Sequence, residues 1–197
     1  MRTDYIKPSI YKEVYQLMQY ENALALRCSL ETGLRIGDVL KMRPADIQGR
    51  TITYTAQKTG KAGKKVVSAD LAKRLKQIAG KKYVFTGRFG DKPRTRQTVW
   101  KDVKKASKEL KIQGNLSCHS ARKTYAVEEF HNEGLTKTQK ELQHNRLDTT
   151  MLYAYSDMLT GGKAVYNDDV IAMLVRIEKK IDVLLSVVSD SSLTAKK

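Results

Sequence analysis

Apolar residues recur at helical spacing through most of this sequence, and that periodicity limits its fold more than any other feature. Within residues 95–110, Val99, Val103, Ala106 and Leu110 fall on one face of a helix. Similar stripes recur along the chain, separated by short polar or glycine-bearing segments. They predict helices over 10–19, 22–33, 36–42, 68–80, 95–110, 120–132 and 136–143.

The helical period is interrupted once, at "TITYTAQ", where polar and apolar residues alternate and Ile52, Tyr54 and Ala56 share one side. A second short stretch, "KKVVSA", resumes after the glycine-bearing turn "KTGKAG". Two such stretches around a glycine turn are typical of a β-hairpin. The fold class predicted is therefore mainly α with a small β-hairpin or sheet element (α+β).

Turn and cap residues indicate where the early helices begin and end. Ser9 is positioned to cap the helix over 10–19. Gly33 is positioned to end the helix over 22–33 in a left-handed conformation. Pro44 stops the helix that follows.

The chain is strongly basic, with 37 Lys and Arg against 21 Asp and Glu and a formal net charge of +16. Such a charge favours a polyanionic partner, and nucleic acid is the first candidate. An acidic membrane surface is less favoured, because the basic residues recur along the chain instead of gathering on one amphipathic helix. No apolar run reaches membrane length, and Cys28 lies in an apolar helical run as expected of a buried free thiol. We expect a cytoplasmic protein that contacts no membrane.

The last part of the chain has a different pattern. After the paired glycines of "SDMLTGGKAVYNDD", apolar residues follow alternating steps of four and three, as in a coiled-coil seam. The helix they predict either docks on its own domain or packs on a partner molecule. The seam residues are Val170, Leu174, Ile177, Ile181, Leu184 and Val188.

In "SCHSARKTY", His119 and Arg122 are three residues apart and so share a face of the predicted helix. Alone, the pair has an ordinary structural explanation. Beside a nucleic-acid partner it suits phosphate chemistry, since the arginine fork matches two phosphate oxygens. No cluster of carboxylates suited to Mg²⁺ is obvious in the sequence. Phosphoryl transfer without metal or cofactor then requires cations, a proton donor and a protein nucleophile.

Four segments together resemble the tyrosine recombinases, the phage-integrase family. They are "ETGLRIGDVLKMRPADI", "QKTGK" in the predicted hairpin, "HSAR", and "LQHNRLDTTMLYAYSD". They occur in the family's order and at family-like separations, over roughly residues 10 to 160. Two positions depart from the family's usual pattern, Gln143 for a glycine and Lys123 for a histidine, and neither removes a catalytic group.

The resemblance implies a catalytic set of Arg35, Lys58, His119, Arg122, His144 and Tyr153. In that family the two arginines clamp the nonbridging oxygens of the scissile phosphate, and the lysine protonates the departing 5′ oxygen. The first histidine acts as acid and base on the nucleophile, and the second hydrogen-bonds the phosphate. The tyrosine attacks and forms a 3′-phosphotyrosine, which conserves the bond energy for rejoining.

Two of these assignments have competitors nearby. Lys61, Lys64 and Lys65 lie in or beside the same hairpin turn as Lys58. Tyr155 lies two residues beyond Tyr153, which is favoured by its nine-residue separation from His144.

The resemblance also implies an organisation and a set of partners. We expect a catalytic DNA-cleaving and rejoining domain over 1–160, and a linker with a C-terminal helix for protomer interaction over 161–197. The N-terminal core-binding domain usual in the family is expected to be missing. The expected partners are double-stranded DNA and further copies of the chain, assembled as a tetramer on DNA through the C-terminal helix, in a prokaryotic or phage setting.

Two rival functions remain open from the sequence. One is a DNA-binding relative that has lost catalysis, and the other is a DNA-relaxing enzyme resembling type IB topoisomerases. The six retained side chains favour an enzyme, and the heptad seam favours a recombinase, which works in assembled protomers.

Overall fold

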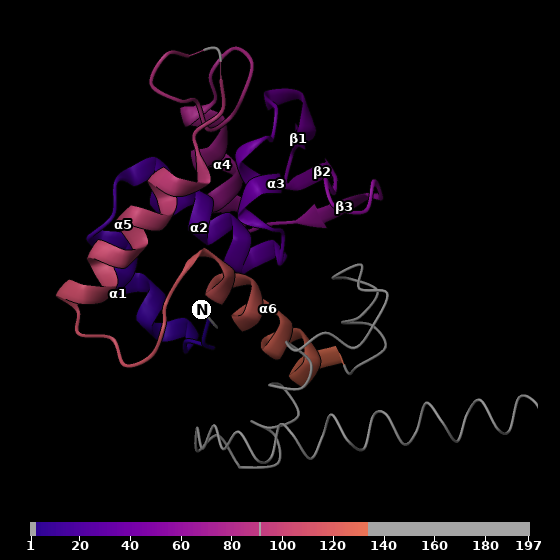
Figure 1. Cartoon of the computed structure of the whole chain (residues 1–197). Helices are drawn as coiled ribbons and strands as arrows, with labels where there is room; N and C mark the ends of the chain where they lie inside the picture. Colours follow the sequence, from indigo (N-terminus) through magenta and orange to yellow (C-terminus); the bar gives the residue numbers. More distant parts are fainter. Residues whose placement is uncertain (1–2, 91, 134–197) are drawn as a thin grey trace, which may run out of the picture. The chain divides into compact units, whose positions relative to one another are not determined.

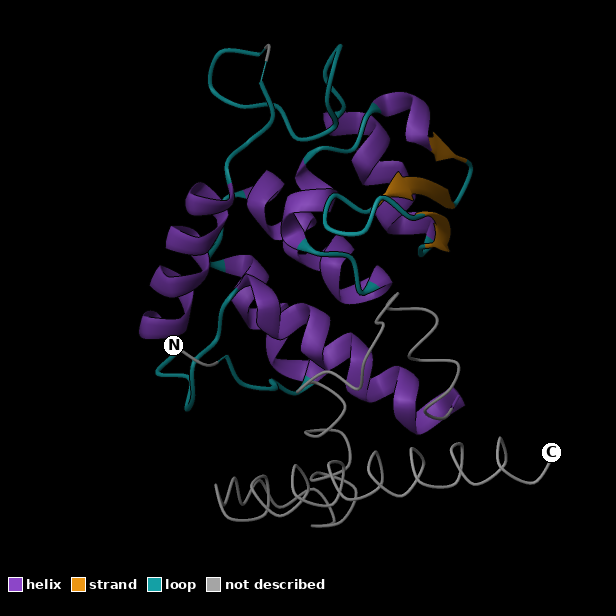
Figure 2. Ribbon diagram, turned by 45° about the vertical axis from the view of Figure 1, so that its right-hand side comes forward, coloured by secondary structure: helices purple, strands orange, loops and turns teal. Residues whose placement is uncertain are grey.

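The computed structural model describes residues 3–90 and 92–133. In this part of the chain, helices predominate and one small sheet accompanies them, which confirms the predicted fold class (Figures 1 and 2). The α-helices are α1 (Tyr11–Gln16), α2 (Tyr20–Thr32), α3 (Ile36–Leu40), α4 (Ala69–Ile78), α5 (Arg96–Glu109) and α6 (Cys118–Glu133). The 3₁₀ turns are η1 (Pro8–Ile10) and η2 (Pro44–Asp46), and the strands are β1 (Ile47–Gln48), β2 (Thr51–Thr55) and β3 (Ala62–Val66).

Helix α2 is the centre of the described fold. It packs against α1, α3, α4, α5 and α6, and its run Ala23–Leu26 is buried along its whole length. Because other helices contact α2 on several sides, apolar residues occur on several of its sides. The core around α2 includes the large buried side chains Tyr11, Leu26 and Phe85. None of the helices in the described residues has the length and hydrophobicity of a membrane-spanning segment.

The sheet is antiparallel with the order β1-β2-β3. Strands β2 and β3 form the predicted hairpin, in which Ile52 pairs with Lys65 and Tyr54 with Gly63. Ile52 is fully buried and Tyr54 packs against the core, so the alternating stretch does place one side inward. Strand β1 was not predicted, because two residues are too few to show a period of two.

The prediction for the end of the helix over 22–33 is confirmed, and side chains cap two later helices. Gly33 ends α2 with φ 69°, and its N–H donates to the Ser29 carbonyl at 2.9 Å. The side chains of Ser68 and Thr95 cap α4 and α5 by accepting from Leu71 N and Thr98 N. The prediction for Ser9 is wrong: it lies inside η1, which begins at Pro8, and α1 covers only Tyr11–Gln16.

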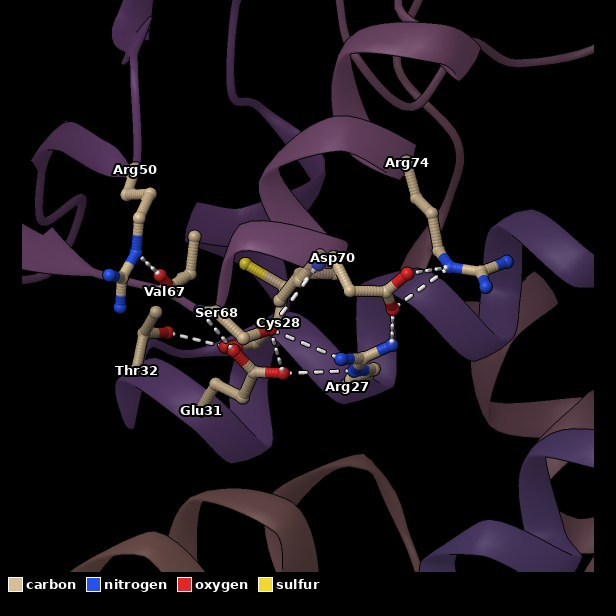
Figure 3. A network of polar contacts seen from close by, with 10 residues as sticks. Arg27, Cys28, Glu31, Thr32, Arg50, Val67, Ser68, Asp70 and Arg74 are labelled. Carbon is tan, nitrogen blue, oxygen red and sulfur yellow. Dashed lines mark hydrogen bonds and ion pairs between the residues drawn. The ribbon is translucent and has the colours of Figure 1, made fainter.

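A polar network joins α2 to the start of α4, directly after the hairpin (Figure 3). Glu31 accepts hydrogen bonds from the Ser68 backbone N–H at 2.8 Å and from Ser68 Oγ at 3.1 Å. Arg27 donates to Glu31 at 2.9 Å and to Asp70 at 2.7 Å. Because Glu31 lies two residues before Gly33, these contacts tie the end of the hairpin to the turn that carries Arg35.

Candidate active site

Arg35 is held by a turn whose geometry is set by its neighbours. After Gly33, the buried Leu34 is fixed by its carbonyl, which accepts from Ser29 Oγ at 2.7 Å. Arg35 then begins α3 as its N-cap with an extended backbone and is partly exposed. The left-handed conformation at Gly33 is what turns the chain so sharply that Arg35 leaves the core.

Lys58 lies in the turn between β2 and β3 and is exposed, as the hairpin prediction requires. The turn is closed by hydrogen bonds from Ala56 N to the Lys61 carbonyl at 2.9 Å and from Gly60 N to the Ala56 carbonyl at 2.7 Å. Gly60 has φ 68°, a conformation that glycine adopts without steric cost.

The structure distinguishes Lys58 from its competitors. Lys65 is buried on β3, donates to the Tyr125 hydroxyl at 3.1 Å and lies 5.0 Å from the centre of that ring. Lys64 lines a neighbouring cavity of about 650 Å³ together with Arg43. Of Lys58, Lys61, Lys64 and Lys65, Lys58 alone is among the residues that line the cavity containing Arg35.

His119 and Arg122 lie in the first two turns of α6, which packs along α2. The start of α6 is anchored by buried residues, including Leu116 and Ala121, and His119 N donates to Ser117 Oγ at 3.2 Å. Arg122 Nη1 donates to the Gly33 carbonyl at 2.5 Å. This bond joins the "HSAR" segment to the "TGLR" segment, 89 residues apart in sequence.

A cavity of about 740 Å³ brings several of these residues together. Arg35, Lys58 and His119 all line it, and Arg94 and Arg96 add positive charge from the start of α5. Arg96 was not predicted as a site residue. A readable signal existed, since arginine in the first turn of a helix opposes the helix dipole and so suggests a purpose other than stability.

The cationic surroundings change the chemistry of His119. Although the residue is exposed, loss of part of its hydration lowers the pKa of the imidazole, and the positive charges of Arg122, Arg35 and Arg96 lower it further. A lowered pKa keeps the ring neutral near pH 7, so that it can accept a proton.

The remaining predicted site residues, His144 and Tyr153, lie outside the described residues, and so does Tyr155. The predicted helix over 136–143, the glycine-bearing linker and the seam from Val170 to Val188 lie outside them as well. Among the residues that the structure does describe, there is no group of three or more His, Cys, Asp or Glu that could hold a metal ion.

Comparison with known proteins supplies a family. Residues 5–159 match the phage integrase family. The integrase of Escherichia phage P2 is 32% identical over 133 residues, which are 67% of this chain and 36% of that protein. The chain thus spans about a third of the length of this curated relative.

Solved structures share the fold at lower sequence identity. A lambda integrase dimer bound to a COC′ core site superimposes with a TM-score of 0.66 at 19% identity, over 78% of this chain and 48% of that one. XerA recombinase gives 0.64 at 19% identity, over 84% and 68%. The catalytic domain of bacteriophage HP1 integrase gives 0.59 at 19% identity, over 78% and 88%.

Proposed function

Because the chain belongs to the phage integrase family, we propose that it is a site-specific recombinase that cuts and rejoins DNA through a covalent 3′-phosphotyrosine intermediate. Its substrate is double-stranded DNA, met in the cytoplasm of a prokaryotic cell. The reaction uses neither a metal ion nor a cofactor. The catalytic domain extends over residues 1–160.

The observation that carries this proposal is the hydrogen bond from Arg122 to the Gly33 carbonyl. It holds the second arginine of the predicted set against the turn that presents the first, Arg35. Both guanidinium groups also lower the pKa of His119. Two arginines converging on one histidine suit the binding of a single phosphate, whose oxygens accept paired hydrogen bonds from each fork.

The proposed cleavage step balances as follows. The phenol oxygen of Tyr153 attacks phosphorus, the new O–P bond forms, and the bond from phosphorus to the 5′ oxygen breaks. The phenol proton passes to the neutral imidazole of His119, and the ammonium of Lys58 gives a proton to the 5′ oxygen. Arg35, Arg122 and His144 stabilise the charge that develops on the nonbridging oxygens. Rejoining is the same step in reverse, with the 5′ hydroxyl as nucleophile.

The properties of the tyrosine suit this role. Its ordinary pKa of about 10 makes it a fair nucleophile once a base and two guanidinium groups stabilise the phenolate. The same phenolate is a good leaving group when the DNA hydroxyl returns. Water is not required in either direction, so the strand stays joined to protein until it is resealed.

The decisive experiment is covalent trapping on DNA. A library of nicked duplexes with a randomised central segment is incubated with the full chain in EDTA, denatured in SDS and freed of non-covalent DNA. We expect an adduct that forms in EDTA, is lost in Tyr153→Phe and persists in Tyr155→Phe. Sequencing the trapped DNA then identifies the site.

Each alternative function or mechanism predicts a different result in this experiment. DNA that binds the native protein but never yields an SDS-resistant adduct would indicate a binding protein without catalysis. Adducts without sequence preference, together with relaxation of supercoiled plasmid, would indicate a topoisomerase-like enzyme. An adduct that requires Mg²⁺, or one that survives loss of Tyr153, would overturn the proposed mechanism.

We further propose that residues 161–197 form a linker and a helix through which protomers assemble, with four copies on recombining DNA. The support is the seam of apolar residues between Val170 and Val188. Ending the chain before Val170 should leave strand cleavage intact while reducing recombination and the tetramer seen by light scattering on DNA. Unchanged assembly would show that the seam only packs within its own chain.

A further inference from the structure

A glutamine attaches the loop that carries Lys58 to the segment that carries Arg35. Gln57 precedes Lys58, and its side-chain Nε2 donates to the Gly37 carbonyl at 2.8 Å. Its backbone N–H donates to Asp38 Oδ1 at 3.1 Å. One residue thus makes two hydrogen bonds to neighbouring positions in the first turn of α3, whose N-cap is Arg35.

Few residues separate this attachment from Lys58 on one side and from Arg35 on the other. Lys58 is the next residue along the chain from Gln57, and Arg35 is two residues before Gly37. The hydrogen bonds therefore link the backbone next to the lysine to the backbone close to the arginine. Relative movement of their backbones is limited to what the few intervening torsions permit.

Gln57 and Arg96 both lie within van der Waals contact of Gly37. A Cβ placed there would lie 3.8 Å from Gln57 Nε2 and 3.4 Å from Arg96 Cδ. Gln57 and Arg96 thus cover the same small surface of α3. Both also line the cavity that contains Arg35, Lys58 and His119.

The attachment is not needed to build the core. Gln57 is exposed, and the turn has its own closing bonds between Ala56, Gly60 and Lys61. The hairpin is paired from Thr51–Val66 to Thr55–Ala62 and buries Ile52 without it. Loss of the Gln57 side chain should then change where Lys58 is held, not whether the protein folds.

We propose that Gln57 is a positioning residue for Lys58: its contacts with Gly37 and Asp38 hold the lysine at the distance from Arg35 at which its ammonium protonates the departing 5′ oxygen. The proposal rests on the function proposed above, in which Lys58 is that acid. It assigns to Gln57 no contact with DNA.

The test compares two leaving groups on the duplex recovered by trapping. One duplex has the ordinary phosphodiester at the scissile position, and the other has sulfur in place of the bridging 5′ oxygen. The oxygen needs a proton as its bond to phosphorus breaks. The sulfur leaves as a thiolate and needs no acid, since thiols ionise with a pKa of about 8.5.

Gln57→Leu keeps the bulk of the side chain and removes its donor, and Gln57→Glu keeps the shape but turns a carboxylate toward the Gly37 carbonyl. Both should cleave the oxygen duplex about 10- to 100-fold more slowly than the unmodified protein. Both variants should cleave the sulfur duplex at nearly the rate of the unmodified protein. Lys58→Ala should show the same pattern more strongly, whereas Arg35→Ala should be slow on both duplexes.

Gln48→Leu is the matched control, an exposed glutamine on β1 for which normal rates on both duplexes are expected. Slow cleavage of both duplexes by the Gln57 variants would overturn the proposal, since a DNA contact or a folding defect has that result. Normal cleavage of both would overturn it as well. The proposed function stands if the Gln57 variants give either of these results while the unmodified protein forms its adduct and the sulfur duplex restores cleavage by Lys58→Ala. If the unmodified protein forms no adduct, the proposed function and the role of Gln57 are both wrong.

Discussion

Replacing Glu31 with alanine should lower the free energy of unfolding by about 1–2 kcal/mol, and the value follows from the groups it leaves behind. Arg27 would keep its bonds to Asp70 and Ser68 Oγ, at 2.7 and 3.1 Å. The Ser68 N–H would lose its acceptor at 2.8 Å. An orphaned buried donor costs about 1–3 kcal/mol, and the lower part of that range applies because the Glu31 side chain is 23% exposed and water can enter.

Urea unfolding of the full chain followed by circular dichroism measures this change. A loss of this size moves the midpoint by roughly 0.5–1 M at an unchanged slope. The matched control is Glu109→Ala, which removes an exposed pair to Lys105 at 3.9 Å and should cost less than about 0.5 kcal/mol.

A double-mutant cycle with Ser68→Ala isolates the side-chain contact between Ser68 Oγ and Glu31. The serine variant loses the α4 cap and its Oγ bond to Glu31 but keeps the backbone bond. We expect a coupling energy of about 0.5 kcal/mol or more between the two positions. If Glu31→Ala unfolds within experimental error of Glu109→Ala, the network in Figure 3 does not join α2 to α4 in solution. If the two effects add without coupling, the Ser68 Oγ bond to Glu31 contributes nothing to stability.

Three further predictions concern the site and the core. Gly33→Ala, at φ 69°, should cost about 1 kcal/mol in urea unfolding; no loss would mean that the turn is not left-handed. In an NMR titration without DNA, His119 should have a pKa below its ordinary value of 6.5 and should stay mostly neutral as the pH falls to 6.5. Arg96→Ala should raise this pKa toward 6.5. A pKa above 6.5 in the unmodified protein would contradict the described cavity. Burial raises the pKa of the Cys28 thiol to about 12 and that of Cys118 to about 11, so both should react with a thiol reagent only after unfolding, and rapid reaction of the native protein would refute this.

The elements that the sequence predicted well are those whose signals are local. The stripe from Val99 to Ala106 is buried as its spacing indicates, and Gly33 ends α2 in the conformation that glycine tolerates best. The wrong prediction at Ser9 also has a local cause. Ser9 has the chemistry of a cap, but Pro8 begins a 3₁₀ turn there, and the helix starts two residues later.

The fold class, the hairpin and the family could be predicted from the sequence, because helical and strand periods, turn residues and ordered motifs are local features of the chain. Which side chains meet became known only from the folded protein. Packing of α6 on α2 brings Arg122 to Gly33. Lys65 is buried on β3, whereas Lys58 in the turn lines the cavity. Arg96 joins that cavity from the start of α5. These outcomes depend on contacts between residues far apart in sequence, and no pattern within one segment contains them.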